Sequence, residues 1–464
     1  MKILLILFVL ILFFSACGRH EDIGGALPII QLDNYVAEFS STYIRVIIGT
    51  SGFESLVHES VEITSTGAFI ARNGENVFRF NAGEIFRITT EDTGTSFLIT
   101  PENPAEKLEV IGLARNWTGG GNPHYRGVFE ITRHGNGFTI VNELPIEQYL
   151  YAVVPSEMPS SHGVDASKVQ AVTARTFAYR QMRENAFREF GAHVDDSVIS
   201  QVYNNIPENE ISIEAVRATR GQILTFNGEI ISANYFSTSG GTTANFGEVW
   251  AIGGIFPSYT PEYLRARAQF VSYHPGNLRT EEAAAAFFRN TEIPAIDREF
   301  PWFRWQVTMT DEEISERINR NLSVRQTANP ALIHFSNEQN AASIGILLHM
   351  EVTRRGQGGN VMEMIFHGTE NSVSVQTEFN IRALLNPGEI PVTRHDGSLS
   401  GHLNLLPSAF FTFEIDNDNI TFFGGGNGHG VGMSQNGVRA LLDMGLTYVE
   451  ILRHYYPGTE IAFT

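Results

Sequence analysis

Glu157 is the residue whose type and setting best suit acid–base chemistry. It lies in a proline-pinned segment, residues 154–159, between a helix-like stretch at 145–153 and a second that begins near Asp165. Connectors flanked by regular elements hold reactive groups in fixed positions. We therefore expect Glu157 to lie on a rigid connector between two helices. We expect it to exchange protons with a polymer whose cleft the rest of the chain builds.

Two basic residues follow on the second of these helix-like stretches. Lys168 and Arg175 are seven residues apart, which places them two turns apart on one side of a helix. A solvated basic face and a pair of substrate clamps are both consistent with this spacing. Glu143 and Glu147 are alternative acids, although at a helix start they would favour the positive end of the helix dipole.

The second informative stretch is a glycine-rich segment at 422–437 that contains His429. A histidine between glycines has no apolar neighbours in sequence, so we expect it to face a substrate; a hydrogen bond within the turn is the other interpretation. A nucleotide site is excluded because no Gly-Lys-Ser/Thr follows the glycines. A serine hydrolase is disfavoured because Ser237 and Ser239 lack a Gly-x-Ser-x-Gly frame. The 14 histidines are dispersed without a His-Glu-x-x-His pattern, so we predict no metal site.

The elements that must position these residues change in type along the chain. Alternating apolar runs separated by Gly, Asn and Asp predict an antiparallel β region from Tyr43, closed by a hairpin around residues 135–137. A central helix is expected from Asp165 to about Glu189, and further helices at 281–290 and 311–320. Ser434 is a plausible N-cap, and Thr447 begins a capping box for a final helix. Further strands are expected at 43–48, 61–63, 69–71, 77–80, 85–88, 108–111, 222–226, 230–235, 344–352, 361–366, 373–377 and 410–415.

Composition limits the class of protein. The net charge of −19 and the absence of a basic patch disfavour nucleic acid as a partner.

The chain starts with Met-Lys, twelve apolar residues at 3–14 and then Ser-Ala-Cys17. This pattern is typical of an export signal, and the apolar run is too short to span a bilayer. Cys17 is the only cysteine, so no intramolecular disulfide can form. We predict that it is the lipidated N-terminus of an exported, membrane-anchored lipoprotein; an ordinary cleaved signal and a secreted or periplasmic protein is the alternative.

Several motifs in a fixed order resemble the SpoIID/LytB family, which comprises sporulation stage II protein D and amidase-enhancer-like proteins. The resemblance extends over about residues 43–464 and has few landmarks between 310 and 420. The matching motifs are YRG at 125–127, NELPIEQY at 142–149, VPSEMP at 154–159, KVQAVTART at 168–176, QVY at 201–203, ATRGQ at 218–222, SGG at 239–241, FRW at 303–305, GHGVGMSQ at 428–435 and ILRHYY at 451–456.

This resemblance implies a peptidoglycan lytic transglycosylase, which cuts the bond between N-acetylmuramic acid and N-acetylglucosamine without water and leaves a 1,6-anhydro sugar. Its catalytic acid falls on Glu157, whose pKa would have to rise toward neutrality, and Val154, Pro155, Met158 and Pro159 could desolvate it. We expect Lys168 and Arg175 to hold the lactyl carboxylate of peptide-stripped glycan. Substrate-binding roles are also predicted for Gln201, Tyr203, Ser239, His429, Ser434 and Gln435.

The resemblance leaves one alternative and one departure. A non-catalytic amidase enhancer, which binds peptidoglycan and assists a cell-wall amidase, has the same motifs. Some family members bind zinc just before the Gln-x-Tyr motif, but residues 195–200 contain no Cys or His. We predict no zinc and no other cofactor, with apolar packing of Val198 and Ile199 ordering this loop instead.

These observations predict an α+β protein whose mixed and antiparallel sheets and helical core form one substrate groove joining residues 157, 175, 239 and 429. The expected partners are glycan strands and, in the alternative, a cell-wall amidase; the membrane is contacted only through the anchor. The expected divisions are a signal at 1–17, a tether at 18–42, a β-rich region at 43–140, the SpoIID-type core at 141–310, a β-rich insert at 311–420 and a closing segment at 421–464.

Overall fold

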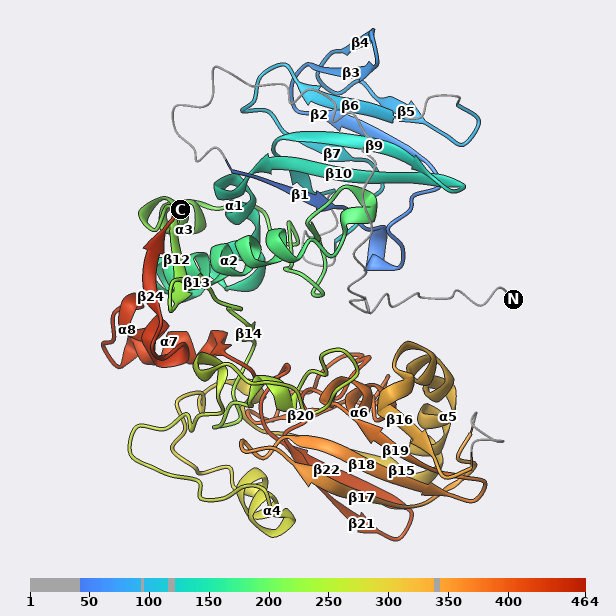
Figure 1. Cartoon of the computed structure of the whole chain (residues 1–464), viewed down its shortest axis with the longest axis vertical. Coiled ribbons are helices and arrows are strands. Elements are labelled where there is room, and N and C mark those ends of the chain that lie inside the picture. Colours follow the sequence, from blue (N-terminus) through green and yellow to red (C-terminus); the bar gives the residue numbers. More distant parts are fainter. Residues whose placement is uncertain (1–41, 93–95, 116–121, 338–342) are drawn as a thin grey trace. The chain divides into compact units, whose positions relative to one another are not determined.

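The computed structural model describes residues 42–92, 96–115, 122–337 and 343–464, and the chain forms two compact units (Figure 1). Unit 1 contains the described residues up to Ser232 together with Glu460–Thr464, and unit 2 contains Ala233–Thr459. The predicted signal and Cys17, and all but the last residue of the predicted tether, lie outside the described residues. The division near residue 232 falls inside the predicted core at 141–310, and the predicted domain boundaries stay predictions.

A seven-stranded sheet forms the larger β layer of unit 1. Its strand order is β11-β1-β10-β9-β6-β3-β4, and only the β1–β11 pair is parallel among these neighbours. The predicted hairpin is confirmed as β9 and β10, with His134 opposite Gly137. The strands are β1 (Tyr43–Ile47), β3 (Phe69–Asn73), β4 (Asn76–Phe80), β6 (Ser96–Pro101), β9 (Val128–His134), β10 (Gly137–Pro145) and β11 (Val194–Asp195).

A second, four-stranded sheet of unit 1 has the order β5-β2-β7-β8. In β2 every other residue is buried, as expected for a strand with one face on the core. Gly127 has φ +78°, and a Cβ there would meet the carbonyl oxygen of Glu143 at 2.2 Å, so the YRG motif lets this segment lie against β10. The strands are β2 (Val61–Ser65), β5 (Phe86–Ile88), β7 (Leu108–Val110) and β8 (His124–Tyr125).

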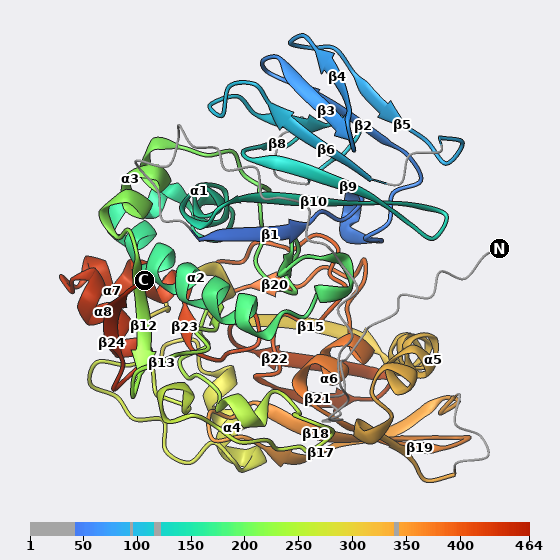
Figure 2. The same cartoon turned by 45° about the horizontal axis from the view of Figure 1, so that its top comes forward.

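The described residues of unit 1 also form three α-helices and a small sheet. Figure 1 and Figure 2 show α1 (Ile146–Glu157) and α2 (Gly163–Glu184) beside β1 and β10. The 3₁₀ turn at Ser160–His162 joins the two helices, and α3 (Glu210–Ala218) packs against both. A three-stranded sheet of order β13-β12-β24 pairs β12 (Gln222–Phe226) with β13 (Glu229–Ile230) and with the C-terminal β24 (Glu460–Phe463).

Two four-stranded sheets share the main core of unit 2. One has the order β20-β15-β22-β21 and the other β16-β19-β18-β17, and α5 and α6 pack on strands of these sheets. The strands are β15 (Trp305–Thr310), β16 (Ile333–Phe335), β17 (Leu347–Arg355), β18 (Val361–Gly368), β19 (Ser372–Gln376), β20 (Thr393–Arg394), β21 (Phe411–Asp416) and β22 (Asn419–Gly424).

The helices of unit 2 begin where the sequence places capping residues. Thr310, Ser434 and Thr447 each accept a hydrogen bond from a backbone N–H of the first turn that follows them. The short parallel pair of β14 (Tyr235–Phe236) and β23 (Met433–Ser434) leads into α7. The helices are α4 (Glu281–Arg289), α5 (Asp311–Ala328), α6 (Glu378–Leu384), α7 (Gln435–Asp443) and α8 (Tyr448–Tyr455).

The predicted α+β class is therefore confirmed. Several predicted elements differ in extent: α2 ends at Glu184, α5 runs on to Ala328, and the strand predicted at 230–235 is two short strands. Among the described residues, no helix combines the length and apolar character needed to cross a bilayer.

Candidate functional site

Glu157 is the last residue of α1. The sequence had predicted it on a connector between two helices. The first ten residues of this helix, 146–155, are all buried, so tertiary packing supports the helix on every side. Pro155 lies within the last turn, and the helix ends two residues later at Glu157. The next residue, Met158, is extended, and its N–H bonds to Val154 O. The proline break therefore acts after Glu157 and not before it. A helix end positions the carboxylate at least as firmly as the predicted loop.

The end of α1 binds the loop that contains the QVY motif. The N–H of Val202 donates to Oε1 of Glu157 at 2.7 Å. The hydroxyl of Ser156 accepts from the N–H groups of Asn205 and Ile206, both at 3.1 Å, and donates to Ala152 O. Glu157 is half-buried, so its side chain is fixed by the protein and is still reached by solvent. Ser156 and Val202 were not among the predicted site residues.

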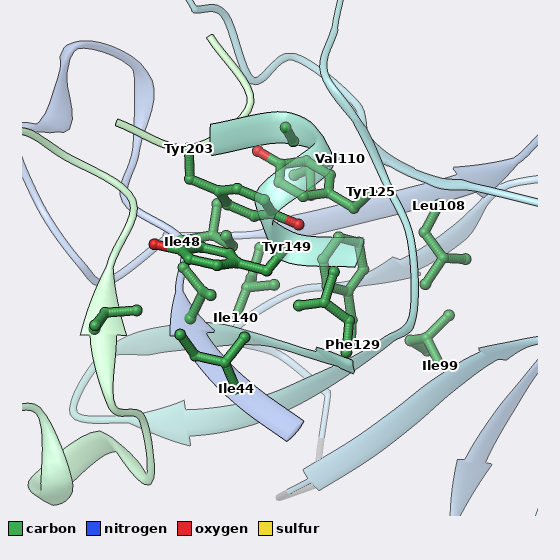
Figure 3. Packing of buried hydrophobic residues seen from close by; sticks show 14 of the residues in the cluster. Ile44, Ile48, Ile99, Leu108, Val110, Tyr125, Phe129, Ile140, Tyr149 and Tyr203 are labelled. Atoms are coloured by element: carbon green, nitrogen blue, oxygen red, sulfur yellow. The ribbon is translucent and has the colours of Figure 1, made fainter. Parts of the chain in front are cut away.

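Tyr203 and Gln201 lie in the core beneath this loop. Tyr203 packs between Tyr125 and Tyr149, with ring centroids 5.7 and 4.9 Å away, and its hydroxyl donates to Asn142 Oδ1 at 2.8 Å (Figure 3). Gln201 accepts from the Tyr149 hydroxyl and donates to Ala174 O. Both residues are buried, so in this structure they support the loop, which differs from the predicted contact with substrate.

The negative charge of Glu157 reaches into this core. Burial, and after it the charge of Glu157, raise the pKa of Tyr149 well above its usual value. Tyr149 is therefore a neutral hydrogen-bond donor at any pH at which the protein works. Its hydroxyl donates to Gln201, two residues before Tyr203.

The segment 195–200 is ordered differently from our prediction. Val198 and Ile199 are 82% and 65% exposed, so the apolar packing expected of them is wrong. Polar groups order the loop instead. Asp195 accepts from the hydroxyl of Ser197, and buried Asp196 accepts from Arg115 and from the N–H of Gly49. Burial raises the pKa of Asp196 to about 6 despite the nearby arginine.

The donor set of this segment does not fit the zinc that some SpoIID/LytB proteins carry. It offers two aspartates and no His or Cys, and the carboxylate of Asp196 is already engaged by Arg115 and Gly49. Within the part of the chain that the structure describes, no group of three or more His, Cys, Asp and Glu side chains is arranged to hold a metal ion. The absence of a metal stays a prediction.

Lys168 and Arg175 occupy different environments on α2. Lys168 is half-buried, and its Nζ lies 2.8 Å from Asp165 Oδ1. Arg175 is fully buried and forms a two-pronged ion pair with Glu147, at 2.8 Å from Nε and 2.7 Å from Nη2. It also donates to Val216 O and Gln222 O. In this structure Arg175 supports the fold, which differs from both the predicted clamp and a solvated face.

The two other glutamates considered as acids are also paired. Glu147 lies in the first turn of α1 as expected, but its partner is Arg175 and it also accepts from the N–H of Gly221. Glu143 lies in β10 and not at a helix start, and its carboxylate pairs with Arg45. Glu147 is buried, and the side chain of Glu143, which is 25% exposed, is bound to the arginine.

Ser239 and Ser434 meet at a buried carboxylate in unit 2. Oδ2 of Asp297 accepts from the N–H of Ser239 at 2.8 Å and from the hydroxyl of Ser434. The Ser239 N–H is also 3.1 Å from Ser434 Oγ, which caps α7 through Gly437 N. All three residues are buried, so the two serines join distant segments in place of the predicted contact with substrate. Asp297 lies in no recognisable motif, and the sequence offers no signal for it.

His429 forms a hydrogen bond within its own turn, which was the second of the two interpretations of this residue. Its Nδ1 accepts from the N–H of Val431 at 3.0 Å, and its ring lies 4.9 Å from Trp250 and 5.7 Å from Phe236, centroid to centroid. Burial, and after it Arg382, lower its pKa to about 4, so the imidazole is neutral at neutral pH. Its packing neighbours come from elsewhere in the chain, which the sequence could not show. Gln435, the first residue of α7, is half-buried.

The predicted site residues thus divide between the two units. Glu157, Lys168, Arg175, Gln201 and Tyr203 belong to unit 1, and Ser239, His429, Ser434 and Gln435 belong to unit 2. Within unit 1, the end of α1 and the loop at 195–206 form one connected arrangement around Glu157. A single groove that also includes Ser239 and His429 stays a prediction.

Comparison with known proteins finds a family match within unit 1. Residues 134–226, which contain Glu157 and every unit 1 site residue, match the SpoIID family model, described as Stage II sporulation protein. The resemblance to the SpoIID/LytB family is thereby confirmed. Residues 244–432, within unit 2, match a family described as a domain of unknown function, DUF8618.

Two curated relatives are similar over much of the chain. The Amidase enhancer of Bacillus subtilis (strain 168) is 27% identical over 433 residues, which cover 92% of this chain and 55% of that protein. Stage II sporulation protein D of the same organism is 26% identical over 336 residues, 69% of this chain and 76% of the relative. The chain thus spans about half the length of the Amidase enhancer.

Proposed function

We propose that this chain acts on the cell wall as a peptidoglycan lytic transglycosylase with Glu157 as its acid and base. The observation that carries the proposal is the setting of this carboxylate. It is half-buried at the end of a fully packed helix and is oriented by the N–H of Val202 at 2.7 Å. The match of this segment to the SpoIID family model supports the proposal.

One carboxylate is sufficient for this reaction, because the substrate supplies the nucleophile. Protonated Glu157 gives its proton to the glycosidic oxygen while the bond from C1 of N-acetylmuramic acid to that oxygen breaks. The 6-hydroxyl oxygen of the same sugar then bonds to C1, and its proton passes to the carboxylate. Glu157 is regenerated in its acid form and no water is consumed. The Val202 N–H stabilises the carboxylate between the two proton transfers.

In this mechanism Lys168 alone binds the negatively charged carboxylate of the substrate. Removing the stem peptide exposes the lactyl carboxylate of N-acetylmuramic acid, and Lys168 is the basic site residue of unit 1 that solvent reaches. Its ion pair with Asp165 is at the surface and therefore exchanges at low cost. This local attraction lets a chain of net charge −19 bind an anionic polymer.

Digestion of glycan strands that lack stem peptides tests the proposal. The wild-type chain should produce 1,6-anhydro ends that mass spectrometry detects, and Glu157→Gln should lower turnover by about 10²- to 10⁴-fold without changing the fold. Glu184→Gln is the matched control, because Glu184 is the last residue of α2 as Glu157 is of α1. Full activity of the Glu157→Gln chain would contradict the assignment.

A second candidate function is supported by the relative named Amidase enhancer, whose similarity covers 92% of this chain. In that case the chain binds peptidoglycan and speeds an added cell-wall amidase without cutting glycan itself. Glycan recovered with the protein, no anhydro ends, and equal stimulation by the wild type and Glu157→Gln would favour this role.

We further propose that the protein is exported and anchored through Cys17. Membrane fractions of the producing cell should contain the wild type and lose a Cys17→Ser variant.

A further inference from the structure

The loop beside Glu157 exposes two apolar side chains where turns usually carry polar residues. Ser200 N bonds to Ser197 O at 3.2 Å, which makes residues 197–200 a turn with Val198 and Ile199 at its corner. These corner positions favour Pro, Gly, Asn, Asp and Ser, and β-branched apolar residues gain nothing there from the fold. Both side chains project into solvent, 82% and 65% exposed. A choice of residue that opposes local preference is expected at functional sites.

The turn is held firmly, so the exposure does not arise from a loose loop. The Ser197 hydroxyl donates to Asp195 and accepts from the N–H of Ile199 at 3.1 Å. The Ser200 hydroxyl accepts from the N–H of Asp195 at 3.1 Å. Asp195, Ser197 and Ser200 are all buried beneath the corner. Polar groups fix the base of the turn, and the apolar corner is presented in one orientation.

The corner lies close to the candidate acid. Val202, whose N–H binds Glu157, is three residues after Ile199 and four after Val198. Even fully extended, four residues span at most about 14 Å, so both side chains lie within a short stretch of saccharide from the carboxylate. A polymer bound with its scissile bond at Glu157 is therefore long enough to reach the corner of the turn.

We propose that Val198 and Ile199 form an apolar contact for the glycan strand next to the scissile bond, where they cover C–H faces and acetamido or lactyl methyl groups. This inference rests on the proposed function, since it places glycan at Glu157. Two side chains suit a saccharide better than a protein partner, because a stable protein interface covers about 800 Å² and 20–30 residues on each side. The contact excludes water from methyl groups, so it adds affinity without needing charge.

The test measures glycan binding separately from cleavage. Peptide-stripped glycan is titrated against Glu157→Gln protein with and without Val198→Thr/Ile199→Thr, which keeps β-branching and makes the corner polar. We expect binding about tenfold weaker in the loop variant. A Val77→Thr/Ile85→Thr pair is the matched control, since both residues are exposed in unit 1 and Val77 lies in β4, at the other end of the sheet from β11.

A swap that preserves apolar character, Val198→Ile/Ile199→Val, should retain affinity within about twofold. Unchanged binding by the threonine variant, or an equal loss in the control pair, overturns the inference. Unchanged glycan binding with lost stimulation of an added amidase assigns the corner to a protein partner and also overturns it. Corner-dependent binding, combined with no anhydro ends from the wild-type chain, would refute the transglycosylase and keep this inference.

Discussion

The two ends of α1 each carry a glutamate, and their surroundings are opposite. Glu147 is 2% exposed and is locked to Arg175, which has no exposed surface. Glu157, ten residues or about 15 Å further along the helix, is half-buried and is bound by a backbone N–H. The same contrast is found on α2, where Arg175 is sealed and Lys168 reaches solvent.

This contrast separates scaffold from candidate site within one pair of helices. At the sealed end, an ion pair and backbone carbonyls satisfy every charge, which fixes how α1 and α2 pack but leaves nothing for a ligand. At the open end, Glu157 is oriented by the loop at 195–206 and still meets solvent. Charged residues in one motif can therefore have unrelated roles, and their exposure distinguishes them.

The largest expected effect on stability comes from breaking the buried ion pair between Glu147 and Arg175. Arg175→Met leaves the carboxylate of Glu147 buried without its partner, which should lower the free energy of unfolding by about 3–5 kcal/mol. Denaturant titration followed by far-UV circular dichroism measures the change. The double variant Glu147→Leu/Arg175→Met removes both charges and should recover most of the loss. If Arg175→Met were as stable as the wild type, the sealed end would not be scaffold.

A second buried carboxylate, that of Asp297 in unit 2, should make the stability of the protein depend on pH. Burial raises its pKa from 3.8 to about 6, so the folded state holds its proton more tightly than the unfolded state. Its contribution to stability is present below pH 3.8 and is lost as pH rises through 6, by about 3 kcal/mol at most.

Tryptophan fluorescence follows unit 2, because three of the four tryptophans, Trp250, Trp302 and Trp305, lie there. Denaturant titrations at pH 4 and pH 6 should show a larger loss of stability in the wild type than in Asp297→Asn, whose amide oxygen still accepts from Ser239 and Ser434. Equal losses in the two proteins would contradict a buried, proton-holding Asp297.

The smallest effect on stability is expected at the open end. Lys168→Gln removes a surface pair worth about 0–1 kcal/mol, so unfolding should be nearly unchanged. Binding to peptide-stripped glycan should weaken about fivefold at low salt and by less at high salt. Arg180→Gln is the control, since Arg180 forms a comparable exposed pair with Glu184 on the same helix. Equal binding by both variants would remove Lys168 from the site.

The sequence predicted best what depends on local signals. The hairpin turn at 135–137, the cap at Ser434 and the capping box at Thr447 each act within a few residues, and the structure confirms them. The SpoIID segment was also recognised, because its motifs are short and ordered.

Partners that are distant in sequence decided the rest. The sequence around Arg175 does not indicate that its partner is Glu147, 28 residues earlier. Likewise, the sequence around Ser434 does not indicate that its partner is Asp297, 137 residues earlier. The end of α1 was placed too early because a proline in the last turn of a buried helix is tolerated when packing supports that turn. Val198 and Ile199 were expected inside because apolar residues usually are, and the polar network beneath them is not visible in sequence.

One measurement tests the central claim directly: the products of glycan cleavage formed in water labelled with heavy oxygen. If Glu157 returns the proton while the 6-hydroxyl closes on C1, the new ends are anhydro sugars lighter by one water and free of label, and the Glu157→Gln chain forms almost none. Labelled reducing ends, or unlabelled anhydro ends formed equally well by Glu157→Gln, would contradict the account.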